Sequence, residues 1–92
     1  MIVIAVSNGA GSVTINFGNL ACEAVSLISP DNTPMYDFAI YNANGSFVVG
    51  GTGISVQKTK INELFRLVGS CQLSITGAAD DGNYSVEVFP RE

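Results

Sequence analysis

The chain has 92 residues, of which 47% are hydrophobic and only 13% are charged, and its eight acidic and four basic residues give a net charge of −4 at pH 7. This length predicts one domain, residues 1–92, with a modest core. The acidic balance argues against nucleic acid as a partner, because phosphate binding requires clustered Lys and Arg. With so little charge, we expect other subunits to cover part of the surface; the alternative is a surface rich in Ser, Thr, Asn and Gly.

The apolar run Met1–Val6 does not fit a signal peptide, because no positive segment precedes it and the Asn and Gly residues at 8–11 end it. No run approaches membrane-spanning length. These features predict a product made in a cytoplasm, with no membrane as a partner. Cys22 and Cys71 fit neither a zinc spacing nor a redox pair, so we expect two buried, unlinked thiols.

Apolar and polar residues alternate along most of the chain, and turn residues interrupt them at intervals of about eight to twelve positions, which predicts an all-β fold. A loop is expected at 29–34, because its prolines cannot donate to a strand ladder. Asn42–Gly45 is expected to be a tight turn, since Asn-Gly tolerates the positive φ of a type I′ hairpin. The expected strands before this turn are Ile2–Val6, Val13–Phe17, Leu20–Ile28 and Tyr36–Ile40.

The glycine-rich segment 50–53 is expected to break the strand that returns from this hairpin. Residues 62–68 are open between a short helical turn capped by Asn62 and an extended segment. A further turn is expected at Asp80–Asn83. The expected strands after the hairpin are Phe47–Val49, Ile54–Lys60, Cys71–Ile75 and Tyr84–Val88.

The last third of the chain carries a family-like pattern. Leu73-Ser74-Ile75 followed by Asp80-Asp81-Gly82-Asn83-Tyr84 resembles the E-to-F region of immunoglobulin-like domains, where an Asp-x-Gly-x-Tyr motif forms a tyrosine corner. The resemblance implies structural roles for Asp80, Gly82 and Tyr84, with the tyrosine buried and its hydroxyl bound to the backbone. Val86 replaces the second cysteine of antibody domains, and tryptophan is absent. We therefore predict a small immunoglobulin-like antiparallel β-sandwich of about seven to eight strands, without the antibody disulfide.

Two further patterns resemble known classes of protein. Tyr36–Tyr41 followed by Asn44-Gly45 is similar to a strand and turn of the bacterial pre-peptidase C-terminal β-sandwich. Taken whole, the chain resembles the small β-sandwich accessory proteins of tailed phages, which begin at a strand and end on Gly-x-Tyr-x-Val, as Gly82–Val86 does. This resemblance implies a capsid decoration, collar or tail-associated subunit, made in the host cytoplasm and located in the virion. Its partners would be other virion proteins and copies of itself.

Residues that commonly carry catalysis are missing. The chain has no His, so a Ser–His or Cys–His nucleophile cannot form. Asp80 and Asp81 are interpreted as turn residues, and a calcium site with Asn83 is the open alternative. The glycines at 50–53 lack the Lys-Ser/Thr of a phosphate loop. We therefore expect a protein that is not an enzyme, with no catalytic residue, no cofactor and no metal.

Two short segments are apolar on both strand faces, so one face can pack on the core while the other requires a partner. The interface candidates are Ile2, Val3, Ile4, Phe47, Val48 and Val49. The alternative is that the first strand is central in its sheet and wholly buried. The competing function is an immunoglobulin-like carbohydrate- or protein-binding module of a bacterial protein. Its sugar site would need an aromatic platform, and at least two of Tyr36, Tyr41 and Tyr84 look structural.

Overall fold

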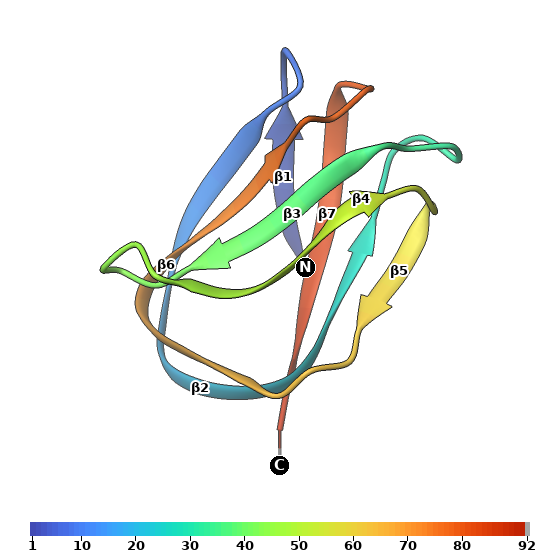
Figure 1. The fold of residues 1–92 in the computed structure, drawn as a ribbon. Coiled ribbons are helices and arrows are strands. Elements are labelled where there is room, and N and C mark those ends of the chain that lie inside the picture. The colour runs from blue at the N-terminus through green and yellow to red at the C-terminus, as the bar shows by residue number, and fades with distance from the viewer. Residues whose placement is uncertain (92) are drawn as a thin grey trace.

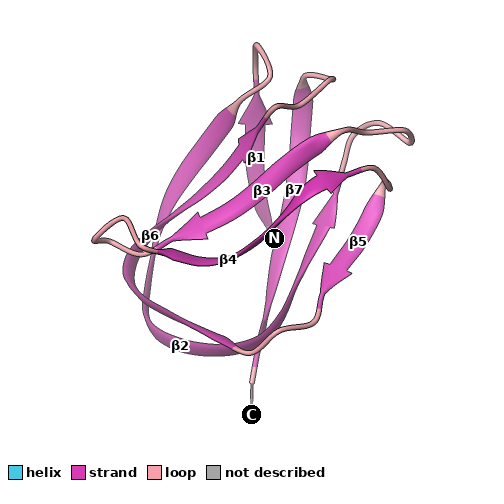
Figure 2. Ribbon diagram, viewed as in Figure 1, coloured by secondary structure: helices cyan, strands magenta, loops and turns pink. Residues whose placement is uncertain are grey.

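The computed structural model describes residues 1–91, which form strands and contain no helix (Figure 2). All strand pairs are antiparallel, so the predicted all-β antiparallel sandwich is confirmed. No helix in this described part could cross a membrane. The strands are β1 (Ile2–Val6), β2 (Gly11–Ile28), β3 (Tyr36–Tyr41), β4 (Phe47–Ile54), β5 (Lys58–Ile61), β6 (Phe65–Thr76) and β7 (Gly82–Pro90).

The long strand β2 belongs to both layers of the sandwich. Its first part, Gly11–Asn16, pairs with β6, and its last part, Val25–Ile28, pairs with β5 and β7. One layer therefore has the order β1-β7-β2-β5 and the other the order β2-β6-β3-β4. With the two parts of β2 counted separately, this is the strand order of a jelly roll. Immunoglobulin domains connect their strands differently, in ABED and CFG sheets.

A bend joins the two parts of β2 where the sequence suggested a break between strands. The register against β6 shifts between Asn16 and Asn19, so Phe17 and Gly18 lie opposite the single residue Gly69. Gly18 has a φ of 68° and Gly69 a φ of 69°, which other residues adopt only at a cost of about 1–2 kcal/mol. Asn16 Oδ1 accepts a hydrogen bond of 2.9 Å from the Gly18 N–H. β2 and β6 therefore curve together from one layer to the other (Figure 1).

The turns at Asn8-Gly9 and at 42–45 are of different types. At Asn8-Gly9, φ angles of 56° and 81° define a type I′ turn, and Ser7 and Ala10 exchange both backbone hydrogen bonds. At 42–45 only Gly45 has a positive φ, 86°, and its N–H donates to the Asn42 carbonyl oxygen at 2.9 Å. This is a type I turn followed by a left-handed glycine. The type I′ conformation predicted at Asn44-Gly45 is therefore wrong.

Three further boundaries were predicted incorrectly or left open. β4 continues through the glycines at 50–53, because the register shifts against β3 let the strand bend without ending. A turn at 55–57 divides the expected strand Ile54–Lys60, so that only its last residues belong to β5. The open segment 62–68 becomes extended from Phe65 onward.

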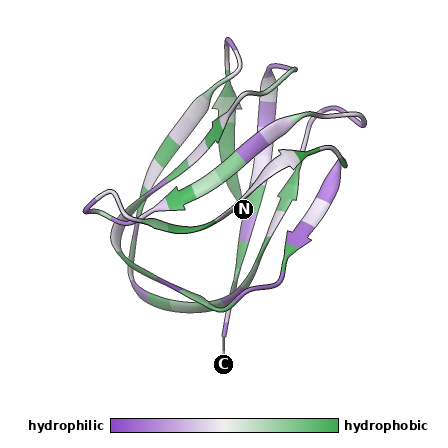
Figure 3. Cartoon of the chain, in the orientation of Figure 1, coloured by the Kyte–Doolittle hydropathy of each residue, from purple (hydrophilic) through white to green (hydrophobic). Residues whose placement is uncertain are grey.

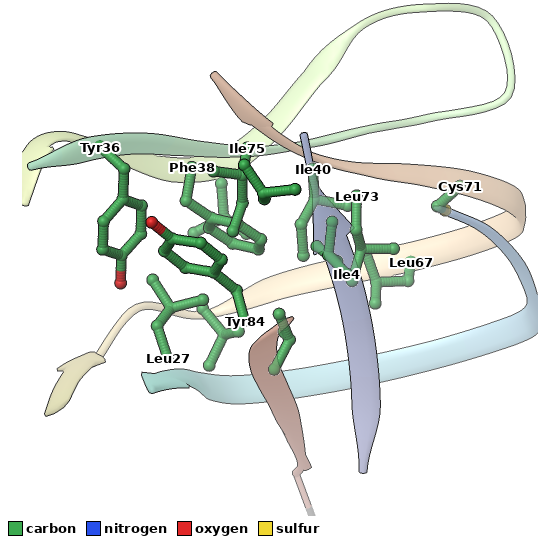
Figure 4. Packing of buried hydrophobic residues seen from close by; sticks show 14 of the residues in the cluster. Ile4, Leu27, Tyr36, Phe38, Ile40, Leu67, Cys71, Leu73, Ile75 and Tyr84 are labelled. Atoms are coloured by element: carbon green, nitrogen blue, oxygen red, sulfur yellow. The ribbon is translucent and has the colours of Figure 1, made fainter. Parts of the chain in front are cut away.

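The core lies between the two layers, and Tyr36 and Tyr84 meet at one end of it with ring centroids 4.9 Å apart and planes at 70° (Figure 4). The Tyr84 hydroxyl donates to the Asp80 carbonyl oxygen at 2.8 Å, which is the corner contact implied by the immunoglobulin-like motif. Gly82 has a φ of 139°, and a Cβ added there would lie 3.0 Å from Pro30 Cγ. The motif therefore fixes the loop that leads into β7.

Every strand except β5 contributes fully buried apolar side chains to this core. Cys22 and Cys71 are among them, and both are free thiols, as expected. Burial raises the pKa of the Cys22 thiol. The buried apolar residues are Ile4, Val6, Cys22, Ala24, Val25, Leu27, Tyr36, Phe38, Ile40, Val49, Leu67, Cys71, Leu73, Ile75, Tyr84 and Val86.

Replacement of Tyr84 by Phe is expected to lower the free energy of unfolding by about 1 kcal/mol, because it removes the corner hydrogen bond. Tyr36→Phe is the matched control. The Tyr36 hydroxyl is buried and has no hydrogen-bond partner within residues 1–91. Its removal should therefore leave stability unchanged or raise it. Urea denaturation of both variants measures the difference, and a loss in Tyr36→Phe as large as that in Tyr84→Phe would contradict this assignment.

Candidate functional site

β1 lies at the end of its layer, and its ladder partner within residues 1–91 is β7. Ile4 is fully buried and Ile2 is half-buried against the core, whereas Val3 is 48% exposed. Strand alternation turns the Ile4 side chain into the core, so Ile4 could join a contact at this edge through its backbone alone. The alternative of a central, wholly buried first strand is wrong. Val3 carries the outward apolar face that the sequence predicted.

The second candidate segment, at the start of β4, divides in the same way. Phe47 is 62% exposed, Val48 is half-buried, and Val49 is fully buried. Val49 lies opposite Ile40 of β3 and its side chain faces the core, so it adds no apolar surface to the outward face of β4. Phe47 lies opposite Tyr41, and the two rings form an edge-to-face pair with centroids 6.2 Å apart.

The outer edges of β1, β4 and β5 differ in how they are protected against pairing with another chain. β5 is short and carries Lys58 and Lys60, and it is coloured hydrophilic in Figure 3. β4 is glycine-rich and irregular in register. β1 has no charge and pairs with β7 without a register shift. β2 approaches β1 near Ala5, since a Cβ added at Gly11 would lie 2.2 Å from the Ala5 carbonyl oxygen. The unprotected stretch is therefore Ile2–Ile4.

The outer face of the β2-β6-β3-β4 layer, named here the Tyr41 face, is polar and almost uncharged. In cross-strand register, Thr14, Gln72 and Tyr41 form one row and Ser12, Ser74 and Ala39 form the next. In the segments that build it (11–16, 36–41, 47–54 and 70–76) the single charged residue is Asp37. The face therefore offers hydroxyl and amide groups around one tyrosine ring.

Three shallow hollows lie on this face, and Tyr41 lines all of them. The first, of about 570 Å³, lies between Tyr41, Thr14 and Gln72. A second, of about 460 Å³, continues past Gln72 to Ser12 and Ser74, and a third, of about 360 Å³, lies between Tyr41 and Phe47. Tyr41, for which the sequence pattern predicted no separate role, is therefore central to the hollows on this face.

The outer face of the β1-β7-β2-β5 layer has a different character. Ser26 of β2 lies between Lys60 of β5 and Glu87 of β7, both exposed. Lys60 also extends over the Phe89 ring, with Nζ 4.6 Å from the ring centroid. Exposed charges are thus present on this layer, so the lack of charge on the Tyr41 face is a local property.

The loops at one end of the sandwich bring Asp31, Asp80 and Asp81 together with the first hairpin. Asp81 accepts hydrogen bonds of 3.2 Å from the backbone N–H groups of Asn8 and Gly9, a role that the sequence analysis did not predict. A hydrogen bond with Asp31 and repulsion from it raise the pKa of Asp80. Among residues 1–91, no group of three acidic, His or Cys side chains could hold a metal ion. Asp81 therefore secures the Asn8-Gly9 turn.

Comparison with known proteins assigns no family: no family model matches the chain, and no curated protein matches it in sequence.

We predict that Asp31→Asn lowers the pKa of Asp80 toward the ordinary value of 3.8, because the substitution removes the neighbouring carboxylate. A raised pKa means that the folded state binds the proton more tightly than the unfolded chain does. The protonation of Asp80 therefore stabilises the folded state at pH values below the ordinary pKa of 3.8. This contribution to stability is lost as the pH rises through the raised pKa of Asp80 in the folded state. Carboxyl NMR titration of both proteins measures the shift. Asp37→Asn is the control and should leave Asp80 unchanged; an Asp80 pKa at or below 3.8 in the wild type would contradict the account.

Proposed function

We propose that the chain is a non-enzymatic structural protein of a viral particle: a capsid-decorating, collar or tail-associated subunit that binds a repeated lattice and copies of itself. The observation that carries the proposal is the regular, uncharged edge of β1 with Val3 on its outer face. A free edge presents backbone N–H and C=O groups that can pair with a strand of another chain. In a lattice, many weak contacts of this kind add up through avidity.

The positions of the reactive side chains support a role in assembly more than one in catalysis. Both thiols are buried, and the chain contains no His. Tyr36 and Tyr84 are core residues, and burial, with a smaller effect of Tyr84, raises the pKa of Tyr36 to about 12. The groups that most often act as nucleophile or general base are thus absent or withdrawn from the surface.

The proposed contact joins β1 of one copy to β1 of a second copy in antiparallel pairing. Such a contact is symmetric, because each copy presents the same strand to the other. It would extend the β1-β7-β2-β5 layer into one continuous sheet across two molecules. Val3 is the residue whose outward side chain would then lie beside the partner's strand.

Val3→Lys is expected to weaken self-association, because two lysines would be brought together at the paired edges. Val3 is already half exposed, so the variant should fold, and circular dichroism checks that it does. Val56→Lys is the matched control, since Val56 is 53% exposed in the turn between β4 and β5. Light scattering over a concentration series should show that the wild type and Val56→Lys associate and that Val3→Lys remains monomeric.

Mass spectrometry of purified virus particles checks the second part of the proposal, and the gene is expected to lie among capsid and tail genes. A wild type that stays monomeric at every concentration and is absent from particles would contradict the proposal.

The Tyr41 face favours a second candidate function, that of a binding module.

A further inference from the structure

The Tyr41 face lies on the layer that does not contain β1, so a ligand could bind there while the β1 edge is occupied. From its chemistry we infer that this face binds a neutral oligosaccharide. The inference goes beyond assembly and does not depend on it.

The charge of the face limits the chemical class of its ligand. Its one carboxylate, Asp37, accepts a hydrogen bond of 2.8 Å from the Gly53 N–H. The face has no cation, in segments 11–16, 36–41, 47–54 and 70–76, to bind a phosphate, a sulfate or an acidic sugar. A ligand that carries its polarity in hydroxyl groups meets a single carboxylate here, and a hydroxyl group can donate a hydrogen bond to it.

Tyr41 supplies the apolar part of the site. One face of a sugar ring carries C–H groups, and an aromatic ring offers such a face a flat surface together with a polar tip. Phe47 packs against the Tyr41 ring edge-to-face at 73°, and this contact favours one orientation of the ring before a ligand arrives. The pair therefore forms a preorganised platform in the hollowed region.

Side chains beside the platform match the hydroxyl groups of a sugar. Thr14 and Gln72 are exposed in the same row as Tyr41, and Ser74 lies in the row below. Hydroxyl and amide groups both donate and accept hydrogen bonds, as sugar hydroxyls do. Because Tyr41 lines all three hollows, a chain of several sugar units that spans them would contact its ring.

A protein partner fits the same face less well. The buried centres of protein interfaces are enriched in aromatic residues, Met and Arg and depleted in Ser. Beside Tyr41 and Phe47, the rows on this face contain Ser12, Ser74 and Thr14. Of the exposed aliphatic side chains, those of Val56 and Leu64 lie in connecting segments elsewhere, and that of Val68 on β6 lies beside the Asn42–Asn44 turn at the margin of the face.

The experiment titrates the ¹⁵N-labelled protein with neutral oligosaccharides (gluco-, galacto-, manno- and chito-oligosaccharides) up to about 10 mM, the range of weak binding. Shift changes are expected for the amides of Thr14, Tyr41, Gln72 and Ser74. Tyr41→Ala should lower the affinity at least tenfold, whereas Tyr41→Phe, which keeps the ring, should remain within about threefold.

Phe89→Ala is the matched control, because it removes an aromatic ring that packs with Lys60 of the other layer, and it should bind as the wild type does. Sialyllactose and a heparin oligosaccharide serve as charged comparators and should bind more weakly. The inference is overturned if no neutral oligosaccharide shifts these amides, or if the shifts map to another face. It is also overturned if Tyr41→Ala abolishes self-association instead of sugar binding, since the face would then be a protein interface. Failure of the Val3 experiment leaves these outcomes unaffected.

Discussion

The bend of the β2–β6 pair is the constraint on which the rest of the structure depends. Phe17 and Gly18 face Gly69 across it, and the two glycines adopt left-handed conformations that let both strands turn at the same level. Without the bend, β2 would continue in one layer and could not pair with β5 and β7. The bend therefore places the second half of β2 in the β1-β7-β2-β5 layer, opposite the β2-β6-β3-β4 layer that contains its first half, and the core forms between the two layers.

The same bend separates two outer surfaces of different chemistry. The layer that contains β5 and β7 carries exposed charges, and the layer that contains β3 and β4 carries hydroxyls, an amide and the Tyr41–Phe47 pair. Jelly rolls occur both in viral capsids and in lectin domains, so the fold itself does not choose between assembly and sugar binding. The β1 edge and the Tyr41 face belong to different layers, so the two proposed contacts would not compete for the same surface.

Sequence reasoning predicted the parts of the fold that depend on local alternation. The inward residues of β6 and β7 and the Tyr84 corner follow from period-two patterns and one turn motif. The continuity of β2 could not be predicted, because Gly18 in a sequence marks a loop as readily as a bulge. Consecutive apolar residues such as Ile2–Ile4 likewise do not reveal which of them points outward until the strand has neighbours. The Tyr41 face requires residues from four strand segments, and only the cross-strand register brings Thr14, Gln72 and Tyr41 into one row.

The most direct test of this account is the stability of Gly18→Ala and Gly69→Ala in urea denaturation. A Cβ added at either position meets nothing within 4 Å, so any effect comes from the backbone conformation and not from a steric clash. The account predicts that each variant lowers the free energy of unfolding by about 1–2 kcal/mol, the cost of a left-handed alanine. If these glycines affected only the conformational entropy of the unfolded chain, replacement by Ala would leave the stability unchanged or raise it. Either result would contradict a bend that depends on these two residues.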